Sequence, residues 1–130
     1  MKFSEIEFDK YATEAKEKWG NTKAYHQYEE KTKDFSKDKW NIQADEMDAI
    51  FAEFAECLKN RASSSSDIAQ GLVKKLQNHI TENFYNCTDE ILAGLAQMYV
   101  SDERFRDNID RHGEGTAEFI RTAIAYFCYK

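Results

Sequence analysis

The sequence contains no proline in 130 residues. Average usage of about 5% would place roughly six prolines in a chain of this length. Because proline breaks helices, its absence favours long helices with short connections. An apolar fraction of 42%, with nine Phe, seven Tyr and two Trp, excludes a disordered chain. The length predicts one domain, spanning residues 1–130, that buries a sizeable core without disulfides.

Apolar residues recur at helical spacing along the chain and never alternate as in a strand. The expected helices run from Ser4 to Gly20, from a cap at Asn21 or Thr22 to Phe35, from Ser36 to about Arg61, from Asp67 to about Tyr85, from Thr88 through Tyr99, from Ser101 past Ile109, and from about Thr116 through Phe127. The second has a thin apolar stripe, so we expect it to be weakly held. The serines at 63–66 fit a helix–helix connection. The sequence predicts an all-α domain of six to seven helices.

The charge distribution and the lack of targeting segments limit the partners that we expect for this chain. The net charge is −6 and no basic stripe occurs, so we expect no direct binding to nucleic acid. Charges interrupt every apolar run in the first twenty residues, which excludes a signal or transit peptide. No apolar stretch approaches the roughly 20 residues of a membrane span, so we expect no membrane partner. The three cysteines have no metal-site spacing, which indicates free thiols in a reducing cytoplasm.

No pattern supports catalysis, a cofactor or a metal. The chain has no glycine-rich phosphate loop, no GxSxG nucleophile elbow and no HExxH motif. His79 lies on an apolar helix face and is the one candidate for a heme ligand, but an ordinary core histidine is the better interpretation. Asp45, Glu46 and Asp48 are expected on a solvated helix surface. We therefore expect a protein that is not an enzyme.

Cys87 lies just before an expected helix N-terminus, where the helix dipole can lower a thiol pKa and create a nucleophile. No histidine is paired with it, so a small buried residue at a helix junction is the stronger interpretation. Cys57 and Cys128 lie in apolar stripes and are expected in the core.

Four aromatic residues and one methionine lie close in sequence around two expected helix junctions between residues 84 and 105. They are Phe84, Tyr85, Met98, Tyr99 and Phe105. Such residues line clefts for apolar ligands, although rings at helical spacing more often fill a core. Both interpretations remain open on these residues alone.

The segment at 98–105 reads MYVSDERF and is followed by NID at 108–110 and by Gly115. Upstream stand WGNT at 19–22, EKT at 30–32, DEMD at 45–48 and FYNC at 84–87. Together these segments resemble the TipAS-like antibiotic-recognition domain over nearly the whole chain. The resemblance implies a globin-like helical fold without heme, which binds amphipathic antibiotics, chiefly thiopeptides, in a cleft between helices.

In that family the domain is typically the C-terminal effector part of a MerR-type transcriptional regulator, or a stand-alone protein that sequesters the drug. No DNA-binding domain is present in this chain, which matches the stand-alone form or an excised domain. The resemblance also predicts that Trp19 to Phe35 orders over the drug as a lid. The alternative from another class is a helical protein–protein interaction module that holds a partner helix in an aromatic groove.

Motif position assigns the ligand-binding residues that the resemblance implies. They are Trp40, Phe84, Tyr85, Cys87, Gly94, Met98, Tyr99 and Phe105. Family members can carry a second cysteine, seven positions after the one matching Cys87, that captures the drug's dehydroalanine. Gly94 occupies that position here, so we expect reversible binding unless the cleft exposes Cys87. Asp102, Glu103 and Arg104 are expected to cap and tie a helix junction.

Overall fold

The computed structural model describes residues 22–129, and in that range it contains six α-helices and no β-strand. The helices are α2 (Lys23–Thr32), α3 (Lys37–Lys59), α4 (Asp67–Asn83), α5 (Asp89–Ser101), α6 (Glu103–Asp110) and α7 (Thr116–Tyr129). The all-α prediction is confirmed. The helix expected from Ser4 to Gly20 lies outside the described residues. Among residues 22–129, no helix has the length and apolarity that crossing a bilayer requires.

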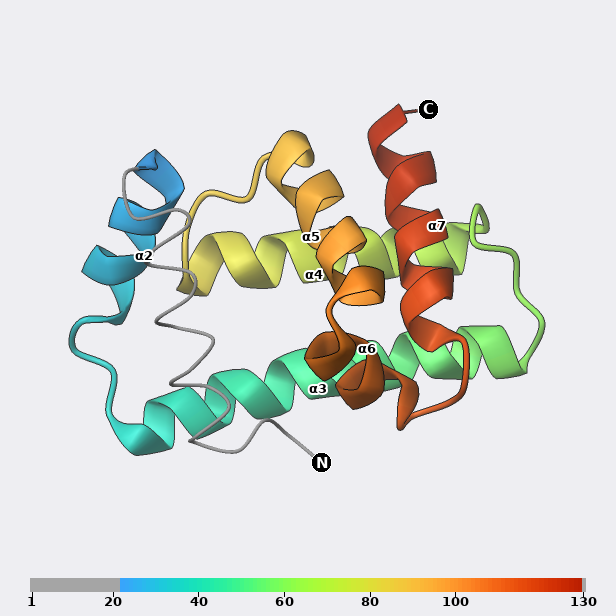
Figure 1. Cartoon of the computed structure of the whole chain (residues 1–130), viewed down its shortest axis with the longest axis horizontal. Helices are drawn as coiled ribbons and strands as arrows, with labels where there is room; N and C mark the ends of the chain where they lie inside the picture. Colours follow the sequence, from blue (N-terminus) through green and yellow to red (C-terminus); the bar gives the residue numbers. More distant parts are fainter. Residues whose placement is uncertain (1–21, 130) are drawn as a thin grey trace.

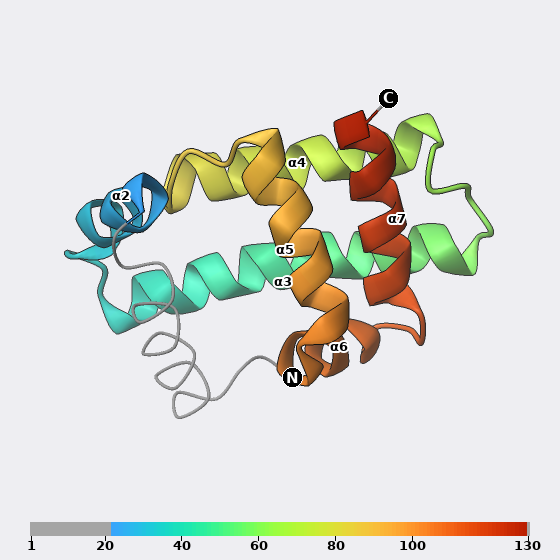
Figure 2. The same ribbon diagram turned by 45° about the horizontal axis from the view of Figure 1, so that its top comes forward.

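The two longest helices, α3 and α4, run side by side in opposite directions and form the frame of the domain (Figures 1 and 2). The serine-rich connection joins them at one end. Helices α5, α6 and α7 lie across this pair and pack on one another. Helix α2 lies at the opposite end, where α3 begins and α4 finishes. The two ends of the α3–α4 pair therefore have different neighbours.

The starts of α2 to α6 follow the sequence closely because each of these helices has a polar cap. A side-chain oxygen at the cap accepts a hydrogen bond from a backbone N–H in the first turn, which satisfies a group that the helix leaves unpaired. The hydroxyl caps are Thr22, Ser36, Ser66 and Thr88. Helix α6 differs from the prediction: Ser101 is the last residue of α5, and Asp102 caps α6 by accepting from the Arg104 N–H at 3.0 Å.

Three helices end earlier than predicted: α3 stops at Lys59 instead of about Arg61, and α2 and α4 also stop short. Helix α2 stops before Phe35 because Ser36 must be extended, with φ −74° and ψ 167°, to cap the next helix. Helix α4 stops before Tyr85 because the backbone of Phe84 leaves the helical region at φ −125°. The early ends of α2 and α4 each release an aromatic residue from a helix, and both residues then meet in space, as described below.

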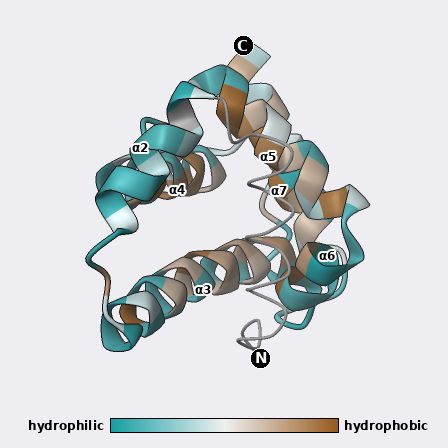
Figure 3. Ribbon diagram, turned by 60° about the vertical axis from the view of Figure 1, so that its left-hand side comes forward, coloured by the Kyte–Doolittle hydropathy of each residue, from teal (hydrophilic) through white to brown (hydrophobic). Residues whose placement is uncertain are grey.

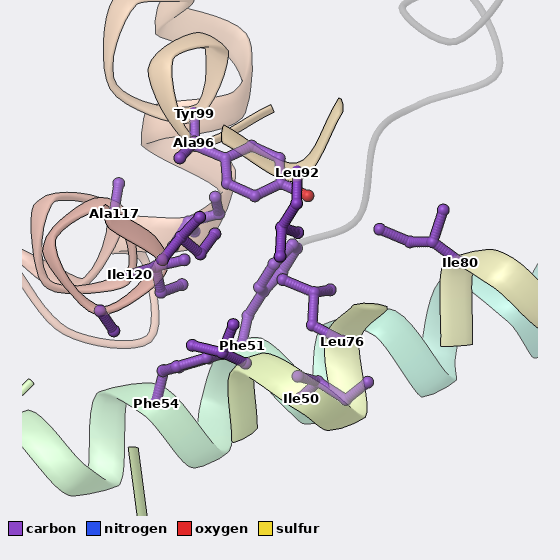
Figure 4. Packing of buried hydrophobic residues seen from close by; sticks show 14 of the residues in the cluster. Ile50, Phe51, Phe54, Leu76, Ile80, Leu92, Ala96, Tyr99, Ala117 and Ile120 are labelled. Carbon is purple, nitrogen blue, oxygen red and sulfur yellow. The ribbon is translucent and has the colours of Figure 1, made fainter. Parts of the chain in front are cut away.

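The core lies where the second half of α3 and the middle of α4 meet α5 and α7. Figure 4 shows Phe51 and Phe54 of α3 and Leu76 of α4 directed toward a common interior with Leu92 of α5 and Ile120 of α7. The largest fully buried apolar side chains are Phe54, Val73, Leu76, Leu92, Ile109, Ile120 and Ile124. Figure 3 shows that α2 is mostly hydrophilic, whereas α5 and α7 carry apolar stretches. The buried side chains of α3, α4, α5 and α7 therefore stabilise one part of the molecule, and α2 contributes little to this core.

Candidate ligand-binding site

Four rings meet at the α2 end of the α3–α4 pair, and we refer to them as the aromatic cluster. They are Tyr28 of α2, Phe35 of the α2–α3 connection, Trp40 of α3 and Phe84 at the end of α4. Trp40 and Phe84 are stacked, with centroids 6.1 Å apart and planes at 20°. Phe35 meets Trp40 edge-on at 5.1 Å, and Tyr28 lies 6.2 Å from both Trp40 and Phe84. Offset stacks and edge contacts are the favourable arrangements for aromatic rings.

Helix geometry explains why the cluster forms. Trp40 lies one turn into α3, whose first turn is fixed by the Ser36 cap, and Phe84 forms the C-cap of α4. Because the helices are antiparallel, the start of α3 and the end of α4 are neighbours. The two early helix ends noted above free Phe35 and Phe84 to turn toward Trp40.

All four rings of the aromatic cluster are only half-buried. The ammonium group of Lys39 lies 5.4 Å from the centre of the Phe35 ring, a cation–π contact at the exposed edge. Rings that are only partly buried at the end of a helix pair keep part of their planar apolar surface in contact with solvent. That combination suits a ligand that is itself planar and amphipathic.

Helix α2 is joined to the end of α4 by polar contacts as well as by Tyr28. Lys31 Nζ donates to the Thr81 carbonyl at 2.6 Å, and the Asn86 N–H donates to Gln27 Oε1 at 2.8 Å. Both bonds are solvent-exposed, and such bonds contribute little because water competes for the same groups. The thin apolar stripe of α2 thus leads to the light attachment expected from the sequence.

Two buried polar side chains border the aromatic cluster. His79 is 8% exposed, and its ring meets Phe84 edge-on at 6.0 Å. Gln43 is 4% exposed and lies on α3 three residues after Trp40, on the same helix face. Among the described residues, neither His79 Nε2 nor Gln43 Oε1 has a hydrogen-bond partner. Burial lowers the pKa of His79, against the opposing charge of Glu46, so the imidazole is neutral at pH 7.

The predicted site residues fall into two groups of ring contacts. Trp40 and Phe84 belong to the aromatic cluster. The rings of Tyr99 and Phe105 lie 5.9 Å apart, and the ring of Phe51 lies 5.6 Å from that of Tyr99. Tyr99 is 4% exposed and belongs to the core, as Figure 4 shows. Two others, Tyr85 and Met98, are half-buried and pack against the core.

Cys87 is 3% exposed and part of the hydrophobic core. Burial raises the pKa of its thiol to about 12, and the nearby Asp89 carboxylate adds to the effect. The thiol therefore stays protonated at neutral pH, opposite to the lowering that a helix N-terminus can produce. The sequence left both interpretations open, and the structure supports the buried one. Cys57 is likewise buried, whereas Cys128 is only partly so.

Gly94 lies on the exposed side of α5. A Cβ atom built at this position meets no other atom within 4 Å. Position 94 can therefore hold a larger residue without a clash, and its side chain would face open space.

The polar residues near the α6 junctions stabilise the fold. Arg104 Nη2 lies 2.8 Å from Asp102 Oδ2, which confirms the predicted ion pair at the α5–α6 junction. Asp48, expected on a solvated surface, is instead partly buried and contacts Arg111 and His112. Burial raises the pKa of Asp48, but hydrogen bonds from both partners outweigh this and hold it below its ordinary value. Among the described residues no cluster of three or more His, Cys, Asp or Glu could hold a metal ion.

Sequence reasoning missed Tyr28, Phe35, Gln43 and the role of His79. Tyr28 and Phe35 belong to an expected helix with few apolar residues. They become part of a site only because α2, α3 and α4 meet in space. The spacing between Trp40 and Gln43 does place both on one helix face, so the sequence carried that signal. The unpaired state of a buried group, in contrast, is visible only in three dimensions.

An all-helical domain with half-buried rings and unpartnered buried polar atoms at one end has the features of a helical domain that binds small molecules. The model of the TipAS antibiotic-recognition domain matches residues 11–127. The chain belongs to that family. The resemblance found in the sequence is thereby confirmed.

Two curated relatives are transcriptional activators of the helix-turn-helix type. TipA of Streptomyces coelicolor is 37% identical over 122 residues, which cover 94% of this chain and 48% of the relative. The protein mta of Bacillus subtilis is 34% identical over 128 residues, covering 98% of this chain and 49% of the relative. The chain spans about half the length of the curated relatives it matches.

A solved structure has the same architecture. It is TipAS of Streptomyces lividans in complex with nosiheptide, described as part of a thiopeptide antibiotic multidrug resistance system. It matches with a TM-score of 0.84 and 33% identity over 98% of this chain and 96% of that chain. The fold of the present chain is therefore the globin-like helical fold of that domain.

Proposed function

We propose that this chain binds amphipathic antibiotics of the thiopeptide class, with the aromatic cluster as the main contact surface. The observation that supports this most directly is the stack of Trp40 and Phe84 in a half-buried cluster. Thiopeptides present flat heteroaromatic rings, which stack on aromatic side chains and gain from apolar burial. The structural neighbour in complex with nosiheptide adds support for this ligand class.

The remaining site residues belong to the same proposal with different roles. Tyr85 follows Phe84 directly and extends the contact surface. Met98 and Phe105 are half-buried and contribute apolar side chains from α5 and α6. Tyr99 is buried, so it positions Phe105 rather than forming a large contact area of its own.

Binding is reversible in this proposal. Covalent capture needs a thiolate, which would add to an electron-poor alkene of the drug. Cys87 is buried with a raised pKa, and Gly94 stands where family members can carry a second cysteine. Shape, stacking and hydrogen bonding then determine affinity, and the chain acts as a binding protein and not as an enzyme.

Helix α2 acts as a cover that becomes more ordered when the ligand binds. Its attachment rests on two exposed hydrogen bonds and on Tyr28, so a ligand seated on the aromatic cluster would supply the apolar surface that α2 lacks. Slower amide exchange across Lys23–Thr32 with nosiheptide than without it is the expected result. Equal exchange in both states would contradict the cover.

In the cell we place the chain in the cytoplasm, as a single domain without a cofactor. Its occupancy either signals to a DNA-binding part or lowers the concentration of free drug. The first role is supported by the helix-turn-helix activators among its relatives. The mixed surface charge and the net charge of −6 argue against direct contact of this chain with DNA.

The test is a titration with nosiheptide, following tryptophan fluorescence and the intact mass of the same sample. We expect saturable quenching with an unchanged protein mass. A mass increase equal to that of the drug would contradict reversible binding and point to Cys87. No change in fluorescence or mass with nosiheptide would contradict the proposed ligand class and favour a partner helix in the aromatic groove.

A further inference from the structure

The two unpartnered polar atoms beside the aromatic cluster are unusual for buried groups. Gln43 Oε1 and His79 Nε2 are both shielded from solvent, yet neither receives a hydrogen bond from the described residues. More than nine-tenths of buried polar groups in proteins have a partner, because an unsatisfied one carries an appreciable free-energy cost. Two such atoms on adjacent helices suggest that a polar group of the ligand supplies the missing hydrogen bonds.

Two polar neighbours lie at Nδ1 of His79. Glu46 Oε2 and Asn83 Nδ2 are each 3.4 Å from it, and Asn83 Nδ2 also donates to the His79 carbonyl at 2.9 Å. The carboxylate only accepts hydrogen bonds and the amide nitrogen only donates them, so the two neighbours require opposite tautomers of the neutral ring. In both tautomers Nε2 has one hydrogen-bonding position without a partner among the described residues.

Both polar atoms adjoin the aromatic cluster. The His79 ring contacts Phe84, and Gln43 follows Trp40 on the same face of α3. The ring of His79 also lies close to the backbone of Gln43, so the two side chains belong to one locality between α3 and α4. A planar compound stacked on Trp40 and Phe84 would therefore bring its edge to this locality.

We infer that Gln43 and His79 form a polar subsite that hydrogen-bonds to polar groups on the edge of the bound compound, with Gln43 Oε1 accepting from an N–H or O–H group and His79 Nε2 as the second contact. This inference rests on the proposed function and adds a chemical requirement to it. A flat apolar compound without polar groups would stack on the rings but leave both atoms unsatisfied. Amide-rich compounds such as thiopeptides carry both donors and acceptors, and the subsite thus selects against simple aromatic hydrocarbons.

The test compares nosiheptide binding by the wild-type chain with binding by Gln43→Met and His79→Phe. Each substitution keeps a side chain of similar size and removes one unpartnered polar atom, Gln43 Oε1 or His79 Nε2. We expect each to weaken the Kd by about fivefold to tenfold, the size of one lost buried hydrogen bond. The free Gln43→Met variant should have a Tm equal to or above that of the wild type, because an unsatisfied acceptor has been removed.

Gln70→Met is the matched control. Gln70 Oε1 is also buried without a partner, but its Nε2 donates to the carbonyls of Ser64 and Ala123, away from the aromatic cluster. This variant should have a lower Tm and an unchanged Kd. Equal Kd values for the wild type, Gln43→Met and His79→Phe would overturn the polar subsite and leave the proposed function standing. Absence of nosiheptide binding by the wild type would overturn both.

Discussion

Phe84 is the centre of the aromatic cluster, and its truncation tests whether the cluster holds α2 and the ends of α3 and α4 together. Its ring contacts Trp40, Tyr28, Phe35 and His79. A fully buried aromatic side chain removes roughly 200 Å² from water, and Phe84, which is more than half buried, removes about 130 Å². At about 25 cal/mol per Å² this gives about 3 kcal/mol, to which the favourable ring geometry makes a smaller addition.

We therefore expect Phe84→Ala to lower the free energy of unfolding by about 3 kcal/mol and the Tm by about 10 °C. Urea unfolding followed by far-ultraviolet circular dichroism measures the first quantity, and a thermal scan measures the second. Tyr126→Ala is the control, because Tyr126 is 47% exposed on α7 and should change stability by less than about 0.5 kcal/mol. A loss of under about 1 kcal/mol for Phe84→Ala would refute the view that the rings form a cohesive cluster.

Three further predictions concern other parts of the chain. Gly94→Cys should gain the mass of nosiheptide on incubation, whereas Gly94→Ala should not; an unmodified Gly94→Cys protein would show that position 94 does not face the drug. Gly71→Ala should raise the free energy of unfolding by about 0.5–1 kcal/mol in urea, because Gly71 is in a helix with open space at its Cβ; a loss would contradict that geometry. Asp48→Asn should cost about 1.5 kcal/mol at pH 7, since Asp48 loses charge-assisted bonds from Arg111 and His112. Because the folded-state pKa of Asp48 is lowered, this contribution is present above the unfolded pKa of about 4 and lost as the pH falls through the folded value; a difference between Asp48→Asn and wild type that persists in acid would contradict the assignment.

The sequence predicted helix starts well because a cap is a local event. Ser36 and Thr88 each place one side-chain oxygen over the first turn, and no distant residue is needed. Gly115, with φ +86°, likewise marks the start of α7 through its own backbone freedom. Helix ends were predicted less well. The ends near Phe35 and Phe84 depend on the chain turning toward rings of other elements.

The candidate site was predicted only in part for the same reason. Trp40 and Phe84 were named from motif position, and the structure brings them together. Phe35 and Gln43 were not named, because their relevance arises from the crossing of α2, α3 and α4. For Cys87 the sequence favoured a buried residue over an activated thiol, and the surrounding core, which suppresses ionisation, supports that preference.

The unequal ends of the α3–α4 pair have a consequence for how such a domain can diversify. At one end, fully buried residues such as Phe54 and Leu76 fix the fold, and most substitutions there threaten folding itself. At the other end the rings are half-buried, so exchanging one for another alters the contact surface with a smaller loss of stability. Selectivity for new compounds can thus change at the aromatic end while the aliphatic end preserves the scaffold, an arrangement well suited to tracking a changing set of toxins.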